Sequence, residues 1–177
     1  MNALSVSLKT MDVLMVADHP ADPEIDLRIE DDAWLKHGDE TALSELARRA
    51  ISAAAHASRT GLVDLLLTND EEMQNLNRDW RRKDKPTDVL SFPADELAFR
   101  SGFLGDIALG YGVFTADVAK LNRSFEAHFS HLLIHGYLHL LGYDHIEDTE
   151  ASEMETLEAD ILAELGYANP YSASEEK

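Results

Sequence analysis

Apolar residues recur along the chain with a period of two in some segments and of three to four in others. The segment IDLRIE at 25–30 alternates apolar and polar residues, which is typical of a half-buried strand. The short apolar run LVDLLLT at 62–68 predicts a buried central strand. VLSFP at 89–93 and GDIALG at 105–110 predict two further strands, and Pro93 ends the first of these because proline cannot donate to a sheet.

The helical period predicts helices in the remaining segments. They cover about 41–58, a segment capped by Asn69 or Asp70 that ends near Trp80, about 112–122, about 124–141, and a last segment that begins at Asp148 or Thr149. Gly142 and Gly166 are expected to end the last two helices, because glycine readily takes the left-handed conformation of a helix C-terminus. This order of elements predicts an α+β domain, with a small mixed β-sheet packed with helices.

The domain organisation predicted from the pattern is simple. Residues 1–24 are weakly patterned and predict a weakly ordered N-terminal extension, while 172–177 predict a polar tail. Residues 25–171 are expected to form one domain, as the length of 177 residues suggests. No stretch approaches the roughly 18 apolar residues of a membrane span, and Asp12 interrupts the short apolar run near the start. A cytoplasmic protein is therefore expected.

The chain carries a formal net charge of −19 and has no cysteine. The charge argues against a protein that coats nucleic acid nonspecifically, because phosphate binding requires lysine and arginine. Without cysteine, a transition metal would need His, Asp or Glu as ligands. The charge is uneven: RDWRRKDK at 78–85 holds five basic and two acidic residues, whereas 141–177 holds eleven acidic residues and one lysine. The basic run favours a local phosphate contact.

The stretch HGYLHLLGYDH at 135–145 predicts a metal site. His135 and His139 are four residues apart on a predicted helix, so their side chains point the same way. Gly142 allows the chain to fold back, and His145 can then reach the same point. Three imidazoles leave one tetrahedral position open, as in catalytic zinc sites. The spacing is that of the long zincin motif HExxHxxGxxH and predicts a zincin-like metal-site helix, with Gly136 in place of the glutamate.

A helix with incidental histidines is the alternative, but three at this spacing with glycine at the bend favour a metal. His131 continues the i, i+4 series and is a ligand, a partner of a ligand or only a neighbour. His145 is preferred as the third ligand, because residues i and i+8 lie about 12 Å apart along a helix. Packing or partial exposure is the better explanation for His128 and His131. Without the glutamate, hydrolysis remains possible because zinc lowers the pKa of bound water to about 7.

HGYLHLLGYDH, together with LNRDWRRKDKPTDVLSFP upstream and LGDIALG, resembles the YbeY family, which comprises bacterial metal-dependent endoribonucleases tied to ribosomal RNA maturation. The resemblance runs from about Ile25 to Tyr171. It implies one zinc ion on His135, His139 and His145. It also implies cleavage of single-stranded RNA, maturation of the 3′ end of 16S ribosomal RNA and ribosome quality control. The implied partners are ribosomal RNA and the ribosome or its proteins, without DNA or membrane.

The same resemblance implies that Arg81 is a catalytic arginine. A guanidinium fork can hold two phosphate oxygens as negative charge develops on them, while metal-bound water attacks the phosphodiester. The neighbouring Arg78, Arg82, Lys83 and Lys85 would position the RNA backbone. The alternative is a solvated run of charges.

Asp106 is a second catalytic candidate, either as a partner of a histidine or as a proton acceptor that replaces the missing glutamate. The alternative is a strand-end aspartate bonded to nearby backbone. The last helix has a polar face with Glu150, Glu153, Glu155 and Glu158, which is either a solvated surface or a docking surface for a basic ribosomal protein.

Two other functions compete with the endoribonuclease. A zincin-like metallopeptidase is suggested by the histidine spacing, but Gly136 and the basic run around Arg81 speak against it. A non-enzymatic ribosome assembly factor with a structural metal is the other alternative.

Overall fold

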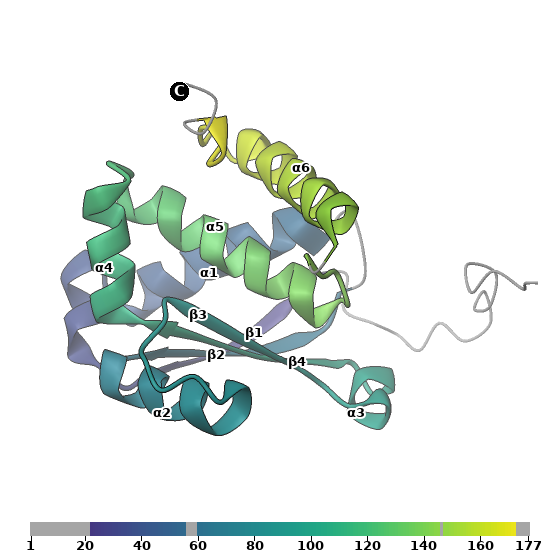
Figure 1. The fold of residues 1–177 in the computed structure, drawn as a ribbon, viewed down its shortest axis with the longest axis horizontal. Coiled ribbons are helices and arrows are strands. Elements are labelled where there is room, and N and C mark those ends of the chain that lie inside the picture. The colour runs from purple at the N-terminus through teal and green to yellow at the C-terminus, as the bar shows by residue number, and fades with distance from the viewer. Residues whose placement is uncertain (1–21, 56–59, 146, 173–177) are drawn as a thin grey trace, which may run out of the picture.

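The computed structural model describes residues 22–55, 60–145 and 147–172 (Figure 1). Residues 1–21 of the predicted extension and 173–177 of the predicted tail lie outside the described residues. None of the helices in the described part of the chain has the length and apolarity needed to cross a bilayer.

The elements follow the predicted order. They are β1 (Glu24–Ile29), η2 (Asp32–His37), α1 (Glu40–Ala55), β2 (Leu62–Thr68), α2 (Asp70–Arg81), β3 (Val89–Pro93), α3 (Glu96–Arg100), β4 (Phe103–Gly110), α4 (Tyr111–Lys120), α5 (Phe125–Leu140) and α6 (Asp148–Glu164). The sheet has the order β1-β2-β4-β3. The first three strands in this order are parallel, and β3 runs antiparallel to β4 along the edge of the sheet. The predicted α+β fold with a mixed sheet is confirmed.

Helix ends follow the local chemistry that the sequence indicates. The side chain of Asn69 accepts a hydrogen bond of 2.9 Å from the backbone N–H of Glu72 and so caps α2. Gly142 and Gly166 have positive φ values of 91° and 84° after α5 and α6. The short helices η2 and α3 were not predicted, because five or six residues are too few to display a helical period.

The sheet separates two hydrophobic regions, because successive side chains of a strand point to opposite faces. Ile107 and Leu109 of β4 belong to the main core, which α1 and α5 cover. Ala108 belongs to a smaller cluster with Met73 of α2 and Leu90 of β3 on the other face. Figure 1 accordingly shows α1 and α5 on one side of the sheet and α2 on the other.

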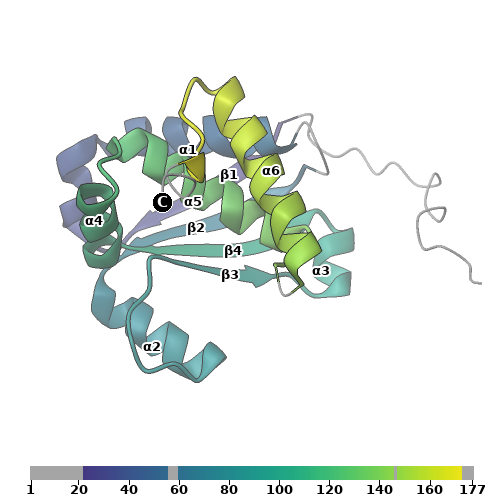
Figure 2. The same ribbon diagram turned by 45° about the horizontal axis from the view of Figure 1, so that its top comes forward.

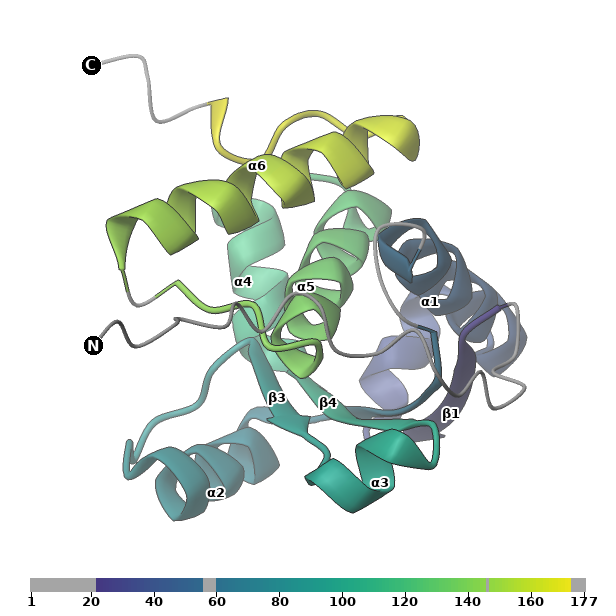
Figure 3. The same cartoon turned by 90° about the vertical axis from the view of Figure 1, so that its right-hand side faces the viewer.

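Helix α5 is the central helix of the fold, since it carries ten buried residues. Figures 2 and 3 show α6 as an outer layer that lies on α5 rather than on the sheet. Within the main core, the fully buried ring of Trp34 contacts Phe114 of α4 and Phe129 of α5, with ring centroids 5.0 and 6.1 Å away. Residues of α5 are thus held from the sheet side and from the α6 side at the same time.

His128 is a core histidine, as the sequence indicated. Its side chain is 3% exposed, and neither ring nitrogen has a hydrogen-bond partner among the described residues. The ring packs beside Phe114, with centroids 5.0 Å apart. Burial lowers the pKa of His128 to about 4. The folded protein therefore holds this ring in its neutral form at neutral pH.

We expect acid to destabilise the protein through His128. Between about pH 6.5 and pH 4 the unfolded chain protonates this ring and the folded chain does not, so stability is lost as the pH falls through this range. Lowering the pH from 7 to 5 should reduce the free energy of unfolding by about 2 kcal/mol. Urea unfolding of the metal-free protein and of a His128→Phe variant at both pH values measures this contribution. An equal pH dependence in the two proteins would contradict the assignment.

Candidate metal centre

The three predicted histidine ligands come together at the carboxyl end of α5 and in the bend that follows it. His135, His139 and His145 each offer one ring nitrogen, and these atoms lie within 4.8 Å of one another. The Nε2 atoms of His135 and His139 are 3.1 Å apart. Two imidazole nitrogens on one tetrahedral zinc ion would lie about 3.3 Å apart. No Asp or Glu of the described residues joins this group as a further donor.

The tautomers of the two helical histidines direct Nε2 toward the site. Nδ1 of His135 lies 2.7 Å from a carboxylate oxygen of Glu158, and Nδ1 of His139 lies 2.9 Å from the backbone carbonyl of Tyr143. Because both partners accept hydrogen bonds, each Nδ1 carries the hydrogen and donates it. Each Nε2 then presents a lone pair. Two lone pairs at 3.1 Å repel each other, and a cation between them removes that repulsion.

The local electrostatics favour the neutral form that a metal ligand needs. Burial lowers the pKa of His139, and the neighbouring His135 and His145 lower it further. His145 is exposed, so the group of three opens toward solvent on the side of the bend. A cavity of about 220 Å³ adjoins the histidines and is also lined by Met154 and Glu155 of α6. The residues present therefore fit a zinc ion with an open fourth position.

Gly142 makes the bend that returns His145 to the helical pair. Its φ of 91° lies in the region that favours glycine, and an added Cβ would meet no atom within 4 Å. A substitution here would thus disturb backbone conformation without creating a steric clash.

We expect Gly142→Ala to lower the free energy of unfolding by about 1–2 kcal/mol and to weaken metal binding. Gly102 offers a matched control, because its φ is 98° and its Cβ position is also empty, but it lies in the turn before β4, away from the histidines. Gly102→Ala should cost similar stability and leave metal affinity unchanged. Chemical denaturation and zinc titration of both variants make the comparison, and equal metal affinity in the two would contradict the role of the bend.

Gly136 faces the sheet rather than the metal group. A Cβ at this position would come within 2.9 Å of the Ser91 hydroxyl oxygen and within 3.2 Å of Ile107. The close packing of α5 against β3 and β4 therefore leaves no room for the glutamate of the zincin motif. The glutamate that serves as the base in peptidases with this motif is therefore absent here.

Glu158 is a functional candidate that sequence reasoning missed. It was expected on the polar face of the last helix, but its side chain is fully buried and turned toward α5. Burial raises its pKa, but hydrogen bonds from His131 and His135 outweigh this effect and lower the pKa to about 2. The signal was present, since Glu158 falls four residues after Met154 and three before Ile161 on the apolar stripe.

His131 is a partner within the site and not a member of the three-histidine group. Its Nε2 lies 3.0 Å from the second carboxylate oxygen of Glu158, and its Nδ1 lies 3.2 Å from the guanidinium of Arg123. Both ring nitrogens are therefore occupied by side chains. This agrees with the preference for His145 as the third ligand.

The structure does not bring Asp106 together with the histidines. Asp106 lies on the face of β4 that carries Ala108, whereas α5 packs against the face of Ile107. Its side chain lines a different cavity of about 660 Å³, which Asp64 and Trp80 also line. Burial and then the charge of Asp64 raise the pKa of Asp106. The expected contact of this carboxylate with a histidine is absent because side chains alternate along the strand.

Arg81 is the last residue of α2 and is exposed. No hydrogen bond or ion pair of the described residues joins it to the histidines. The neighbouring Trp80 contacts Phe92 of β3, with ring centroids 5.6 Å apart, and the next strand residue Ser91 packs against Gly136. Helix α2, which begins the basic run, and helix α5, which carries two of the three histidines, therefore lie on opposite sides of the sheet (Figure 1).

Comparisons with known proteins agree with this architecture. The model of the family described as Endoribonuclease YbeY matches residues 28–166. An Endoribonuclease YbeY of Bradyrhizobium diazoefficiens is 39% identical over 97% of this chain and 94% of its own. One from Legionella pneumophila is 46% identical over 74% of this chain and 85% of its own. The solution structure of TM1509 from Thermotoga maritima has a similar fold, with a TM-score of 0.52 and 24% identity over 86% of this chain and 99% of that one. With the family model covering most of the chain, this protein belongs to the YbeY family of endoribonucleases.

Proposed function

We propose that this protein is a zinc-dependent endoribonuclease that cleaves single-stranded RNA, matures the 3′ end of 16S ribosomal RNA and acts in ribosome quality control in the cytoplasm. The observation that carries the proposal is the convergence of three imidazole nitrogens within 4.8 Å of one another. Family membership supports RNA as the substrate. Zinc is the proposed ion, because three neutral imidazoles with an open position are among its usual catalytic ligand sets.

The proposed mechanism divides the work between the metal group and the basic run. His135, His139 and His145 would hold the zinc ion, and when bound it would supply Lewis acidity toward a phosphodiester and a water molecule with a pKa of about 7. Glu158 and the Tyr143 carbonyl hold the helical rings in the tautomer that binds metal. The Arg81 guanidinium binds phosphate oxygens as negative charge develops on them. Asp106 is assigned no step in this mechanism, because its carboxylate lines the cavity with Asp64 and Trp80 and does not contact the three histidines.

The charge distribution supports a role for the ribosome in substrate binding. A net charge of −19 opposes strong RNA binding by the free protein, and the basic residues of 78–85 offer only a local contact. On α6, Glu150, Glu153 and Glu155 are exposed, so they are available to a basic ribosomal protein. We therefore propose ribosomal RNA and ribosomal proteins as the partners.

Cleavage assays with four substrates test the proposal. Single-stranded RNA, duplex RNA, single-stranded DNA and casein are incubated with the protein, with and without EDTA and with zinc restored. We expect cleavage of single-stranded RNA alone, lost with EDTA and regained with zinc. Metal-dependent cleavage of casein with intact RNA would identify a peptidase instead. A folded, metal-free His135→Ala variant that still cleaves RNA at the unaltered rate would make the metal structural.

A further inference from the structure

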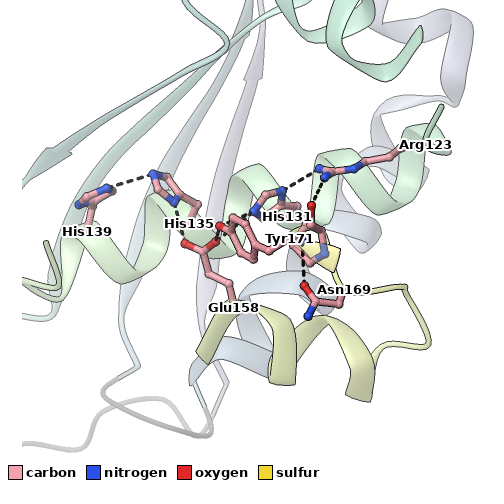
Figure 4. A network of polar contacts seen from close by, with 8 residues as sticks. Arg123, His131, His135, His139, Glu158, Asn169 and Tyr171 are labelled. Atoms are coloured by element: carbon pink, nitrogen blue, oxygen red, sulfur yellow. Dashed lines mark hydrogen bonds and ion pairs between the residues drawn. The ribbon is translucent and has the colours of Figure 1, made fainter. Parts of the chain in front are cut away.

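A continuous chain of polar side chains leads from Arg123 to the metal group (Figure 4). The guanidinium of Arg123 contacts His131, His131 contacts Glu158, and Glu158 contacts His135. The chain crosses from the start of α5 to α6 and back to the end of α5. It therefore ties the metal-binding histidine to a helix that contributes no ligand of its own.

Glu158 is the centre of this chain. One carboxylate oxygen accepts from Nδ1 of His135 at 2.7 Å, and the other accepts from Nε2 of His131 at 3.0 Å and from the Tyr171 hydroxyl. A fully buried carboxylate without such donors would be strongly unfavourable. The guanidinium of Arg123 lies on the far side of the His131 ring from this carboxylate.

The donors and acceptors of the chain fix the proton positions. Arg123 can only donate, so Nδ1 of His131 accepts, and Nε2 of His131 must carry the hydrogen that Glu158 receives. The carboxylate can only accept, so the hydrogen of His135 sits on Nδ1. Nε2 of His135 is thereby left free for a metal. Arg123 reaches this ligand only indirectly, through His131 and then Glu158.

The residues after α6 complete the chain of contacts. Arg123 also donates a hydrogen bond of 2.5 Å to the carbonyl of Pro170, and the Tyr171 ring meets the His131 ring edge-on, with centroids 5.6 Å apart. Asn169 accepts a hydrogen bond of 2.8 Å from the backbone N–H of Tyr171. Figure 4 shows these C-terminal residues beside His131 and Glu158. The segment 169–171 is consequently joined to the metal group through the side chains of His131 and Glu158.

We propose that Glu158 is a positioning residue for the metal centre, and that Tyr171 and the Arg123–His131 pair hold it in place. The C-terminal segment 169–171 then sets the affinity for the metal without contacting it. This inference rests on the proposed metal centre at His135, His139 and His145. Carboxylates that orient ligating histidines typically contribute about 10- to 100-fold to metal affinity.

Two variants with matched controls test the proposal. Glu158→Gln removes the carboxylate charge and one of its acceptors, and Glu164→Gln makes the same change at an exposed position of α6. Tyr171→Phe removes the hydroxyl donor, and Tyr167→Phe makes the same change nearby in the chain, outside the hydrogen-bonded chain of contacts. Zinc affinity is measured by competition with a chromophoric chelator. We expect about 10- to 100-fold weaker binding for Glu158→Gln, about fivefold weaker binding for Tyr171→Phe, and no change in the controls.

A second readout separates positioning from general stability. Cobalt replaces zinc in each protein, and its visible absorption reports the geometry of the ligands directly. We expect the bands to shift in Glu158→Gln and Tyr171→Phe but not in the controls, while thermal unfolding of the metal-free proteins reports their folding. If Glu158→Gln does not fold, Tyr171→Phe decides the question.

The outcomes distinguish this inference from the proposed function. Zinc binding by the unaltered protein, with unchanged affinity and cobalt spectra in both test variants, would overturn the positioning role and leave the metal centre intact. Failure of the unaltered protein to bind zinc or cobalt would overturn both.

Discussion

Replacement of His145 by alanine is expected to abolish zinc binding and to reduce RNA cleavage by roughly 1000-fold or more, because the ion contributes several kcal/mol of transition-state stabilisation. His145 is the most suitable of the three ligands for this test, since its side chain is exposed and the other two are partly buried. The fold should therefore survive the change. Atomic emission measures the metal content, and circular dichroism reports the folding. Cleavage is measured with single-stranded RNA as the substrate.

A control comes from a histidine outside the metal group. His37 lies on η2 and stacks on Phe125, with ring centroids 4.1 Å apart. His37→Ala should keep both zinc and cleavage. A His145→Ala protein that retains one zinc ion per chain would contradict the ligand assignment, and one that loses zinc but cleaves normally would contradict the catalytic role.

Replacement of Arg81 by alanine is expected to reduce the rate of RNA cleavage by about 100-fold or more, with zinc content unchanged. A guanidinium that stabilises developing phosphate charge acts only in the transition state, so kcat should fall more than KM rises. Arg81→Lys should recover little of the rate, because an ammonium cannot form two parallel hydrogen bonds to a phosphate. Steady-state cleavage of a short labelled RNA measures both constants.

The neighbouring arginine supplies the matched control. Arg82 follows α2 in the left-handed conformation, with φ of 59°, and carries the same charge one residue further along. Arg82→Ala should change cleavage by no more than a few fold if it only positions the RNA backbone. Equal losses for the two arginines would indicate that the basic run acts through its total charge rather than through Arg81.

The metal group was predictable because its geometry is local. Helical spacing places His135 and His139 together, and a glycine at 142 allows the return of His145, so no long-range contact is needed to expect the group. The strands at 62–68 and 89–93 were predictable for a similar reason, since their apolar runs are bounded by turn residues.

The surroundings of the metal group were not predictable in the same way. The role of Glu158 depends on how α6 packs across α5, and a sequence pattern shows only that one glutamate interrupts an apolar stripe. The position of Asp106 depends on which face of β4 receives α5. Alternation along the strand shows that Asp106 and Ile107 point in opposite directions, but it does not show which face holds the metal helix. Both answers come from tertiary packing.

X-ray absorption at the zinc edge, on protein reconstituted with zinc, tests the metal centre most directly. We expect one ion per chain, bound by three imidazole nitrogens at about 2.0–2.1 Å and by an oxygen from solvent. A site without bound zinc, or one in which a fourth protein side chain fills the open position, would contradict the catalytic metal centre.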